Sequence, residues 1–150
     1  MVINPLLPPD KPAAHVLPRR TQLAALCWRM GETGREVLLV TSSSGRWILP
    51  KGWPMPHRPP HRAARIEAWE EAGVAKGKVG RKPVGDYISI KRTESGDDVP
   101  VLHKVYAIRV RELVDDFPEA GRRERIWVPV EEAAKMVDEE GLRDLLLNFR

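Results

Sequence analysis

Cysteine and long hydrophobic runs are the features that this chain most lacks. Its 150 residues include one cysteine, Cys27, so no internal disulfide framework exists, which is typical of proteins in the reducing cytoplasm. No segment approaches the ~20 apolar residues of a membrane-spanning helix. The N-terminus also lacks the basic start and apolar stretch of a signal peptide. We therefore expect a cytoplasmic protein without a membrane partner.

Aromatic residues are also scarce, at 6% of the chain, and none are interleaved with a basic stripe. No nucleic-acid-binding motif is present, although the formal net charge is +4. A positive balance favours an anionic partner. Because the basic residues form short clusters near predicted loop and strand ends, they fit a small polyphosphate better than a long polymer. An RNA-associated protein is the remaining hypothesis from charge alone, and it predicts RNA binding with a steep salt dependence.

The chain contains no internal repeat, and its length is that of one domain with a sizeable core. Residues 1–17 are rich in proline and have no periodicity, so we predict a flexible or extended N-terminal arm. Residues 18–150 form the predicted folded domain.

Hydrophobic periodicity predicts strands first and helices last. Strands are expected at 21–30, 36–42, 84–92 and 100–113, with a loop at 76–80. Two helices are expected near the C-terminus, because apolar residues recur at i, i+3, i+4 and i+7 from Val130 and again at the same spacing from Leu142. With one more helix in the middle, this order predicts an α/β fold in which helices sandwich a mixed sheet.

Three glutamates on the middle helix are the strongest functional signal. Glu67, Glu70 and Glu71 follow a proline-rich loop that opens at Gly52, and their helix ends at Gly73. Residues at i, i+3 and i+4 share one helical face, so three like charges are packed together. A hard divalent cation removes that repulsion, and oxygen ligands favour Mg²⁺, Mn²⁺ or Ca²⁺ over zinc. A solvated acidic face is the alternative for an isolated triplet.

The frame around the triplet resembles the signature of the Nudix hydrolases, which spaces glycines, glutamates and apolar residues along a loop and a helix. Two positions depart from it, because Arg58 and Ile66 replace the first Glu and the Arg of the signature. The resemblance implies a Nudix-type α/β/α sandwich with a mixed central sheet for residues 18–150. The matching positions are Gly52, Glu67, Glu70, Glu71, Gly73 and Val74, with Ala68 in the first apolar position.

The resemblance also implies a reaction. Glu67, Glu70 and Glu71 would be catalytic and would bind Mg²⁺, or alternatively Mn²⁺, together with the backbone carbonyl of Gly52 or of Lys51. Water would attack a phosphorus of a phosphoanhydride, with Glu67 or a hydroxide on the metal completing removal of the proton. No covalent intermediate is needed.

Stretches outside the signature resemble one branch of that family, the diphosphoinositol polyphosphate phosphohydrolases. They are the arginines at 19 and 20, SSSGRWILPKG, the basic pair at 91 and 92, and FPEAGRRERIWVPVEEAAKMV. This implies substrates of the diphosphoinositol polyphosphate or dinucleoside polyphosphate class. Arginine forks, lysine point charges and serine hydroxyls suit such phosphates. The candidate phosphate-binding residues are Arg20, Ser42, Ser43, Ser44, Arg46, Lys51, Lys91 and Arg123.

The two departures define an alternative function. In the family the missing pair ties the loop to the helix, and the Arg orients the neighbouring catalytic Glu. Losing both leaves no unpaired charge, and the prolines of the loop restrict its backbone. We therefore expect metal binding to persist, with turnover that is normal or reduced. A non-catalytic polyphosphate-binding module is the alternative function. Trp53 and Trp69 are expected to be packing residues, and His57 and His61 to be solvated.

Nothing in the sequence chooses between inositol and nucleotide substrates.

Overall fold

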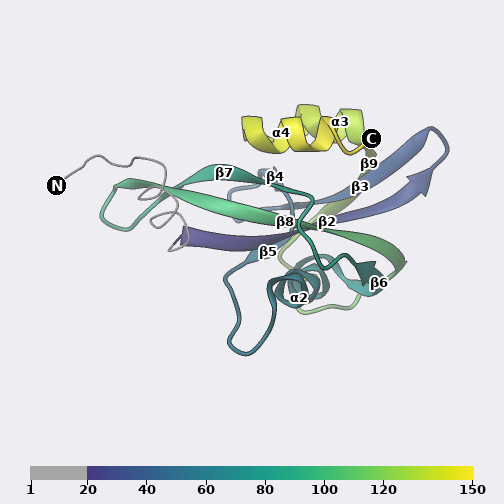
Figure 1. Ribbon diagram of the computed structural model, residues 1–150, viewed down its shortest axis with the longest axis horizontal. Coiled ribbons are helices and arrows are strands. Elements are labelled where there is room, and N and C mark those ends of the chain that lie inside the picture. Colours follow the sequence, from purple (N-terminus) through teal and green to yellow (C-terminus); the bar gives the residue numbers. More distant parts are fainter. Residues whose placement is uncertain (1–19) are drawn as a thin grey trace.

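A computed structural model describes residues 20–150 and shows a sheet with helices on both faces (Figure 1). The predicted α/β/α sandwich is therefore confirmed. The predicted arm at 1–17 lies outside the described residues. None of the helices within 20–150 is long and apolar enough to cross a bilayer.

The described part of the chain forms one eight-stranded mixed sheet. Its centre is the parallel pair of β2 and β8, and the other pairings are antiparallel. Along the main path the order is β4-β3-β2-β8-β6, with β5 on β2, β7 on β8 and β9 on β3. The strands are β2 (Thr21–Gly31), β3 (Gly34–Thr41), β4 (Trp47–Ile48), β5 (Lys51–Gly52), β6 (Val74–Val79), β7 (Gly85–Arg92), β8 (Asp98–Leu113) and β9 (Arg125–Pro129).

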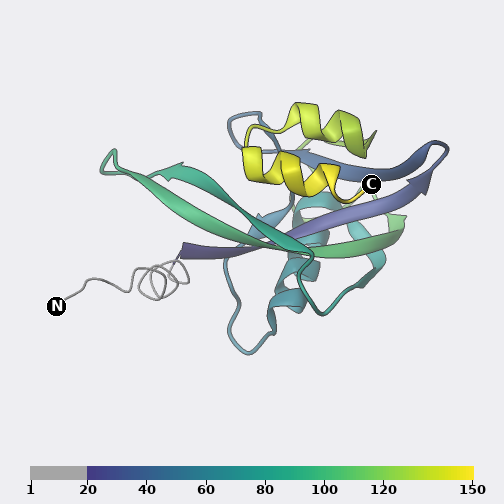
Figure 2. The ribbon, with the colours of Figure 1, turned by 45° about the horizontal axis from the view of Figure 1, so that its top comes forward.

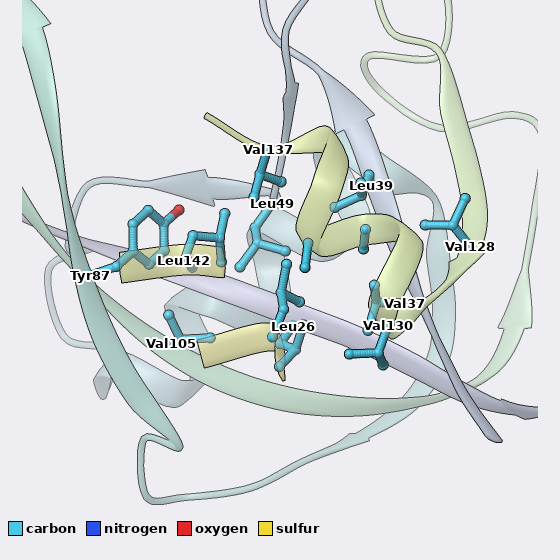
Figure 3. Close-up of a cluster of buried hydrophobic side chains, with 14 residues drawn as sticks. Leu26, Val37, Leu39, Leu49, Tyr87, Val105, Val128, Val130, Val137 and Leu142 are labelled. Carbon is cyan, nitrogen blue, oxygen red and sulfur yellow. The ribbon is translucent and has the colours of Figure 1, made fainter. Parts of the chain in front are cut away.

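Each face of the sheet has its own apolar core. Helices α3 (Val130–Met136) and α4 (Glu140–Leu147) cover one face, and α2 (Pro60–Ala72) covers the other (Figures 1 and 2). Under α3 and α4, the buried side chains of Leu26, Leu39 and Leu142 meet in one cluster (Figure 3). Cys27 and Ile108 are buried in the second cluster, beneath α2. The neighbours Leu26 and Cys27 of β2 therefore face opposite cores, as the pleat requires.

Local sequence fixes both ends of α2. Pro60 occupies the first turn, where its missing N–H costs nothing, and the helix follows a loop rich in proline. Gly73 ends the helix in the left-handed conformation, with φ 75° and its N–H bonded to the carbonyls of Ala68 and Trp69. The predicted helix end at Gly73 is confirmed. The glutamates are thus held on a helix with defined limits.

The structure differs from the sequence-based prediction at two strands. Residues 76–80 were expected to be a loop, but Lys76–Val79 belong to β6, which pairs with the end of β8 through a register shift. The local sequence KGK is polar and weak in β propensity, so the strand depends on its tertiary partner. β9 was not predicted, and it forms because residues 125–129 pair along β3.

Candidate active site

Two of the three helix glutamates form a buried pair. Glu67 and Glu71 are 8% and 7% exposed, and both belong to α2. Their side chains are hydrogen-bonded to each other, as the i, i+4 spacing allows. Two carboxyl groups in such contact share a proton when no cation is present.

Burial and mutual repulsion raise the affinity of this pair for protons. Burial, followed by the charges of Glu71 and Glu70, raises the pKa of Glu67 to about 8. Burial also raises the pKa of Glu71, against the opposing effects of the Arg123 guanidinium and the Lys51 backbone N–H. Glu67 is therefore the protonated member at neutral pH, while Arg123 and the Lys51 N–H favour the ionised form of Glu71 against the effect of burial.

Glycine is required at position 52 because the Glu67 carboxylate lies against it. A Cβ atom added at Gly52 would overlap the carboxylate, with Oε1 of Glu67 only 2.8 Å away. Gly52 belongs to β5, which pairs with Leu23 of β2. The signature loop and the acidic helix are thus in direct contact without the ion pair that the family uses.

Arg123 closes the other side of the acidic pair. Its guanidinium lies 3.4 Å from Oε2 of Glu71 and 2.8 Å from Oε1 of Glu119, and it donates to the carbonyl of Thr41 over 2.7 Å. The side chain is 18% exposed. Arg123 was predicted to contact phosphate, and in the structure its three nitrogens serve these partners inside the protein.

The acidic pair fits a hard divalent cation by its chemistry. Within residues 20–150, no group of three or more His, Cys, Asp or Glu side chains is placed to hold a metal ion. Glu70 is half-buried and close enough to raise the pKa of Glu67, but it does not complete such a group. Glu67 and Glu71 provide carboxylate oxygens, which are the ligands that Mg²⁺ prefers. The backbone at Gly52 lies directly against the Glu67 carboxylate and could add a carbonyl oxygen. A cation there would replace the shared proton.

A cationic cavity of about 320 Å³ lies beside β5, on the sheet face that carries α3 and α4. The structure brings together six of the eight predicted phosphate-binding residues around it. Arg20 is exposed just before β2 and does not line this cavity. Arg123 lines an adjoining recess with Ser42 and Ser43. The six residues that line the cavity are Ser42, Ser43, Ser44, Arg46, Lys51 and Lys91.

The serines sit on a tight turn between β3 and β4. The Ser42 N–H donates to the Arg46 carbonyl over 2.8 Å, and Gly45 takes a φ of 83°, which glycine adopts without strain. The hydroxyl of Ser42 accepts from the Arg46 N–H over 3.1 Å. The Arg46 guanidinium lies 3.5 Å from Asp138 and 3.6 Å from Glu139. Arg46 is thus anchored at the mouth of the cavity yet half-exposed.

Lys51 connects the cavity to the carboxylates. Its backbone N–H donates to Oε1 of Glu71 over 3.2 Å, while its side chain lines the cavity. Burial lowers the pKa of Lys51, and the charge of Glu71 opposes that shift. An anion bound in the cavity would oppose this shift and favour the charged form of Lys51.

Two loop predictions have different outcomes. Trp53 was expected to be a packing residue, but its side chain is 44% exposed and its ring centroid lies 5.3 Å from Nζ of Lys91. Trp53 directly follows β5, where the loop leaves the sheet. His57 is exposed as expected, and it takes a φ of 65°.

The two positions that depart from the signature differ in exposure, and Ile66 is half-buried directly before Glu67 on α2. Arg58 is exposed in the loop. Arg65 donates to the carbonyls of Val74 and Ala75 over 2.9 and 3.1 Å, so it ties α2 to β6. Arg62 lines a recess with Arg65, away from the glutamates. The contact of Gly52 with Glu67, not a substitute arginine, joins loop and helix.

Sequence reasoning missed several residues of the site. Glu119 pairs with Arg123 beside the carboxylates, and its spacing of four from Arg123 was a visible signal. Ser89 shares a strand face with Lys91 because side chains alternate with period two, so it was also predictable. The missed cavity residues are Gln22, Ser89, Ile90, Arg92 and Val101.

Comparison with known proteins identifies the family of this chain. The sequence model of the NUDIX domain matches residues 20–149. The chain therefore belongs to the Nudix hydrolase family.

Similar curated proteins include human diphosphoinositol polyphosphate phosphohydrolase 3-alpha, 39% identical over 122 residues that cover 79% of this chain and 69% of the relative. The bovine 3-beta protein is 38% identical over the same coverage. These relatives support the resemblance to the diphosphoinositol polyphosphate phosphohydrolase branch.

Solved structures show the same fold at lower identity. A C. elegans Ap4A hydrolase in a binary complex superimposes with a TM-score of 0.64 at 22% identity, covering 86% of this chain and 93% of that one. The E. coli dihydroneopterin triphosphate pyrophosphohydrolase gives 0.65 at 13% identity, covering 87% and 94%.

Proposed function

We propose that this protein is a Mg²⁺-dependent hydrolase of phosphoanhydride bonds in diphosphoinositol polyphosphates or dinucleoside polyphosphates. One observation carries the proposal: the buried carboxyl pair Glu67 and Glu71 is joined through Lys51 to a cavity lined by basic and hydroxyl side chains. The names of the similar proteins, which include diphosphoinositol polyphosphate phosphohydrolases and an Ap4A hydrolase, support the substrate class.

The residues of the cavity contribute to phosphate binding in two ways. Arg46, Lys51 and Lys91 supply positive charge, while the serine turn supplies hydroxyls and amides. Lys51 contacts both regions, so we infer that a phosphate chain bound in the cavity extends past β5 toward Glu71. Binding therefore orients the scissile bond toward the carboxylates.

The carboxyl pair supplies the proton chemistry. Glu67, with a pKa of about 8, is protonated at neutral pH and must ionise before it accepts a proton from water. Arg123 holds Glu71 in place and stabilises its negative charge. We assign ligation of Mg²⁺, with Mn²⁺ as an alternative, to Glu67, Glu70, Glu71 and the Gly52 backbone. Bound there, the ion would lower the pKa of water and offset charge on the phosphoryl oxygens.

A substrate panel with product identification tests the proposal. The protein is incubated with a diphosphoinositol polyphosphate, a dinucleoside polyphosphate, ADP-ribose and a nucleoside triphosphate, each with Mg²⁺ or Mn²⁺. We expect metal-dependent release of phosphate-containing products from one or both of the first two.

Binding without product over hours at millimolar Mg²⁺ would contradict hydrolysis and favour a polyphosphate-binding module. The matched control is Glu94→Gln, a substitution in the exposed turn between β7 and β8. It should leave every rate unchanged.

A further inference from the structure

His103 is a fully buried polar residue that the proposed reaction does not use. It lies on β8, is 1% exposed and faces Tyr87 of β7 across the sheet register. The two rings are stacked, with centroids 4.6 Å apart and an interplanar angle of 19°. Its Nε2 atom lies 2.7 Å from Oγ of Ser89. Its Nδ1 atom has no hydrogen-bond partner among residues 20–150.

These contacts determine which nitrogen carries the proton. Burial lowers the pKa of His103 to about 4, and the charge of Lys51 adds to the shift, so the ring is neutral at pH 7. A neutral imidazole has one N–H and one lone pair. A proton on Nδ1 would be a buried donor without an acceptor, which is rarer in proteins than an unpaired lone pair. The proton therefore belongs on Nε2, from which it is donated to Oγ of Ser89.

The direction of this bond fixes the role of the serine. Because Oγ of Ser89 accepts from His103, its own hydroxyl proton is available to another acceptor. Ser89 lines the cationic cavity with Lys51 and Lys91. A phosphate oxygen is the acceptor that such a cavity attracts.

We propose that Ser89 is a phosphate-binding residue of the cavity and that His103 is the positioning residue that makes its hydroxyl a donor. This inference rests on the proposed function, since it assigns a further contact to the same polyphosphate.

The first test is binding of inorganic tripolyphosphate to the whole protein, measured by calorimetry, with turnover measured in parallel. Ser89→Ala should raise Kd about tenfold, as expected for loss of one hydrogen bond to a charged group. It should raise KM by a similar factor while kcat changes less than about twofold, because the contact is made in ground and transition states alike. Ser89→Thr keeps the hydroxyl and should restore both. Ser95→Ala, on the turn of the same hairpin, is the matched control.

The second test separates His103 from a purely structural role. His103→Phe keeps a ring against Tyr87 but removes the Nε2 donor. It should weaken tripolyphosphate binding in the wild-type background and have no further effect in the Ser89→Ala background. Nitrogen-15 spectra of histidine in the wild-type protein should show the Nε2-protonated tautomer at pH 7.

Each failure has a distinct meaning. A proton on Nδ1, a doubly protonated ring, or a Ser89→Ala protein that binds like wild type would overturn this inference and leave the proposed hydrolase standing. Binding that depends on Ser89 without any hydrolysis would overturn the proposed function and leave the Ser89 contact standing. A wild-type protein that does not bind tripolyphosphate would overturn the inference as well.

Discussion

The backbone N–H of Lys51 donates a 3.2 Å hydrogen bond to Oε1 of Glu71, while the side chain of the same lysine lines the cationic cavity. One residue of β5 therefore sets the distance between the carboxylates and the phosphate-binding side chains. Because β5 pairs with β2 in the middle of the sheet, this relationship depends on the rigid part of the fold.

The close approach at Gly52 predicts the effect of a single methyl group. Gly52→Ala places a Cβ atom where the Glu67 carboxylate now lies, so the carboxylate must move. We expect hydrolysis to fall by roughly 100-fold, since small displacements of a catalytic group have such effects. Steady-state kinetics measure it. Gly121→Ala is the control, because a Cβ there meets nothing within 4 Å, and equal rates in both variants would argue against the assigned contact.

Arg123 predicts a loss of stability. It pairs with Glu71 and Glu119 and donates to the Thr41 carbonyl, so Arg123→Gln leaves the partly buried Glu71 without its cation. We expect about 2–3 kcal/mol of destabilisation in urea unfolding. Arg122→Gln changes an exposed neighbour and should cost less than about 0.5 kcal/mol. Comparable losses in the two variants would show that the Arg123 contacts are unimportant.

The sequence predicted the elements that local patterns determine. The strand expected at 100–113 lies within β8, which buries Tyr106 and Ile108 and exposes Arg109. Gly73 was predicted to end α2, because it acts through its own backbone freedom.

Features set by tertiary contacts could not be predicted. β6 is a strand only because β8 offers it a partner. Helical spacing placed all three glutamates on one face, but the depth of the core decided that Glu67 and Glu71 are buried and Glu70 is not. The contact between His103 and Ser89 depends on the register of β7 and β8, which the sequence of a long turn does not fix.

His103 predicts a pH dependence of stability. Its pKa is lowered from 6.5 to about 4 in the folded protein, so between these values the unfolded chain binds more protons. Stability from this residue is therefore complete above pH 6.5 and is lost as the pH falls toward 4. We expect the wild type to lose on the order of 2 kcal/mol more than His103→Phe over this range, in urea unfolding at each pH. Parallel curves for the two proteins would contradict the assignment of a buried neutral histidine.

Metal binding should release a proton. At pH 7 Glu67 is protonated because its pKa is about 8, whereas a carboxyl group must be ionised to bind a cation. Titration calorimetry with Mg²⁺ in two buffers of different ionisation enthalpy should therefore show release of about one proton per site. Heats that do not depend on the buffer would indicate that Glu67 takes no part. Glu94→Gln, in an exposed turn, should release protons as the wild type does.

The central claim is that the buried pair performs Mg²⁺-dependent hydrolysis, and Glu71→Gln tests it most directly. This substitution keeps the size of the side chain and its contact with the Lys51 N–H while removing the charge. With a diphosphoinositol or dinucleoside polyphosphate and millimolar Mg²⁺, we predict a loss of at least about 1000-fold in kcat/KM with an unchanged circular dichroism spectrum. Full activity in the folded variant would contradict the account.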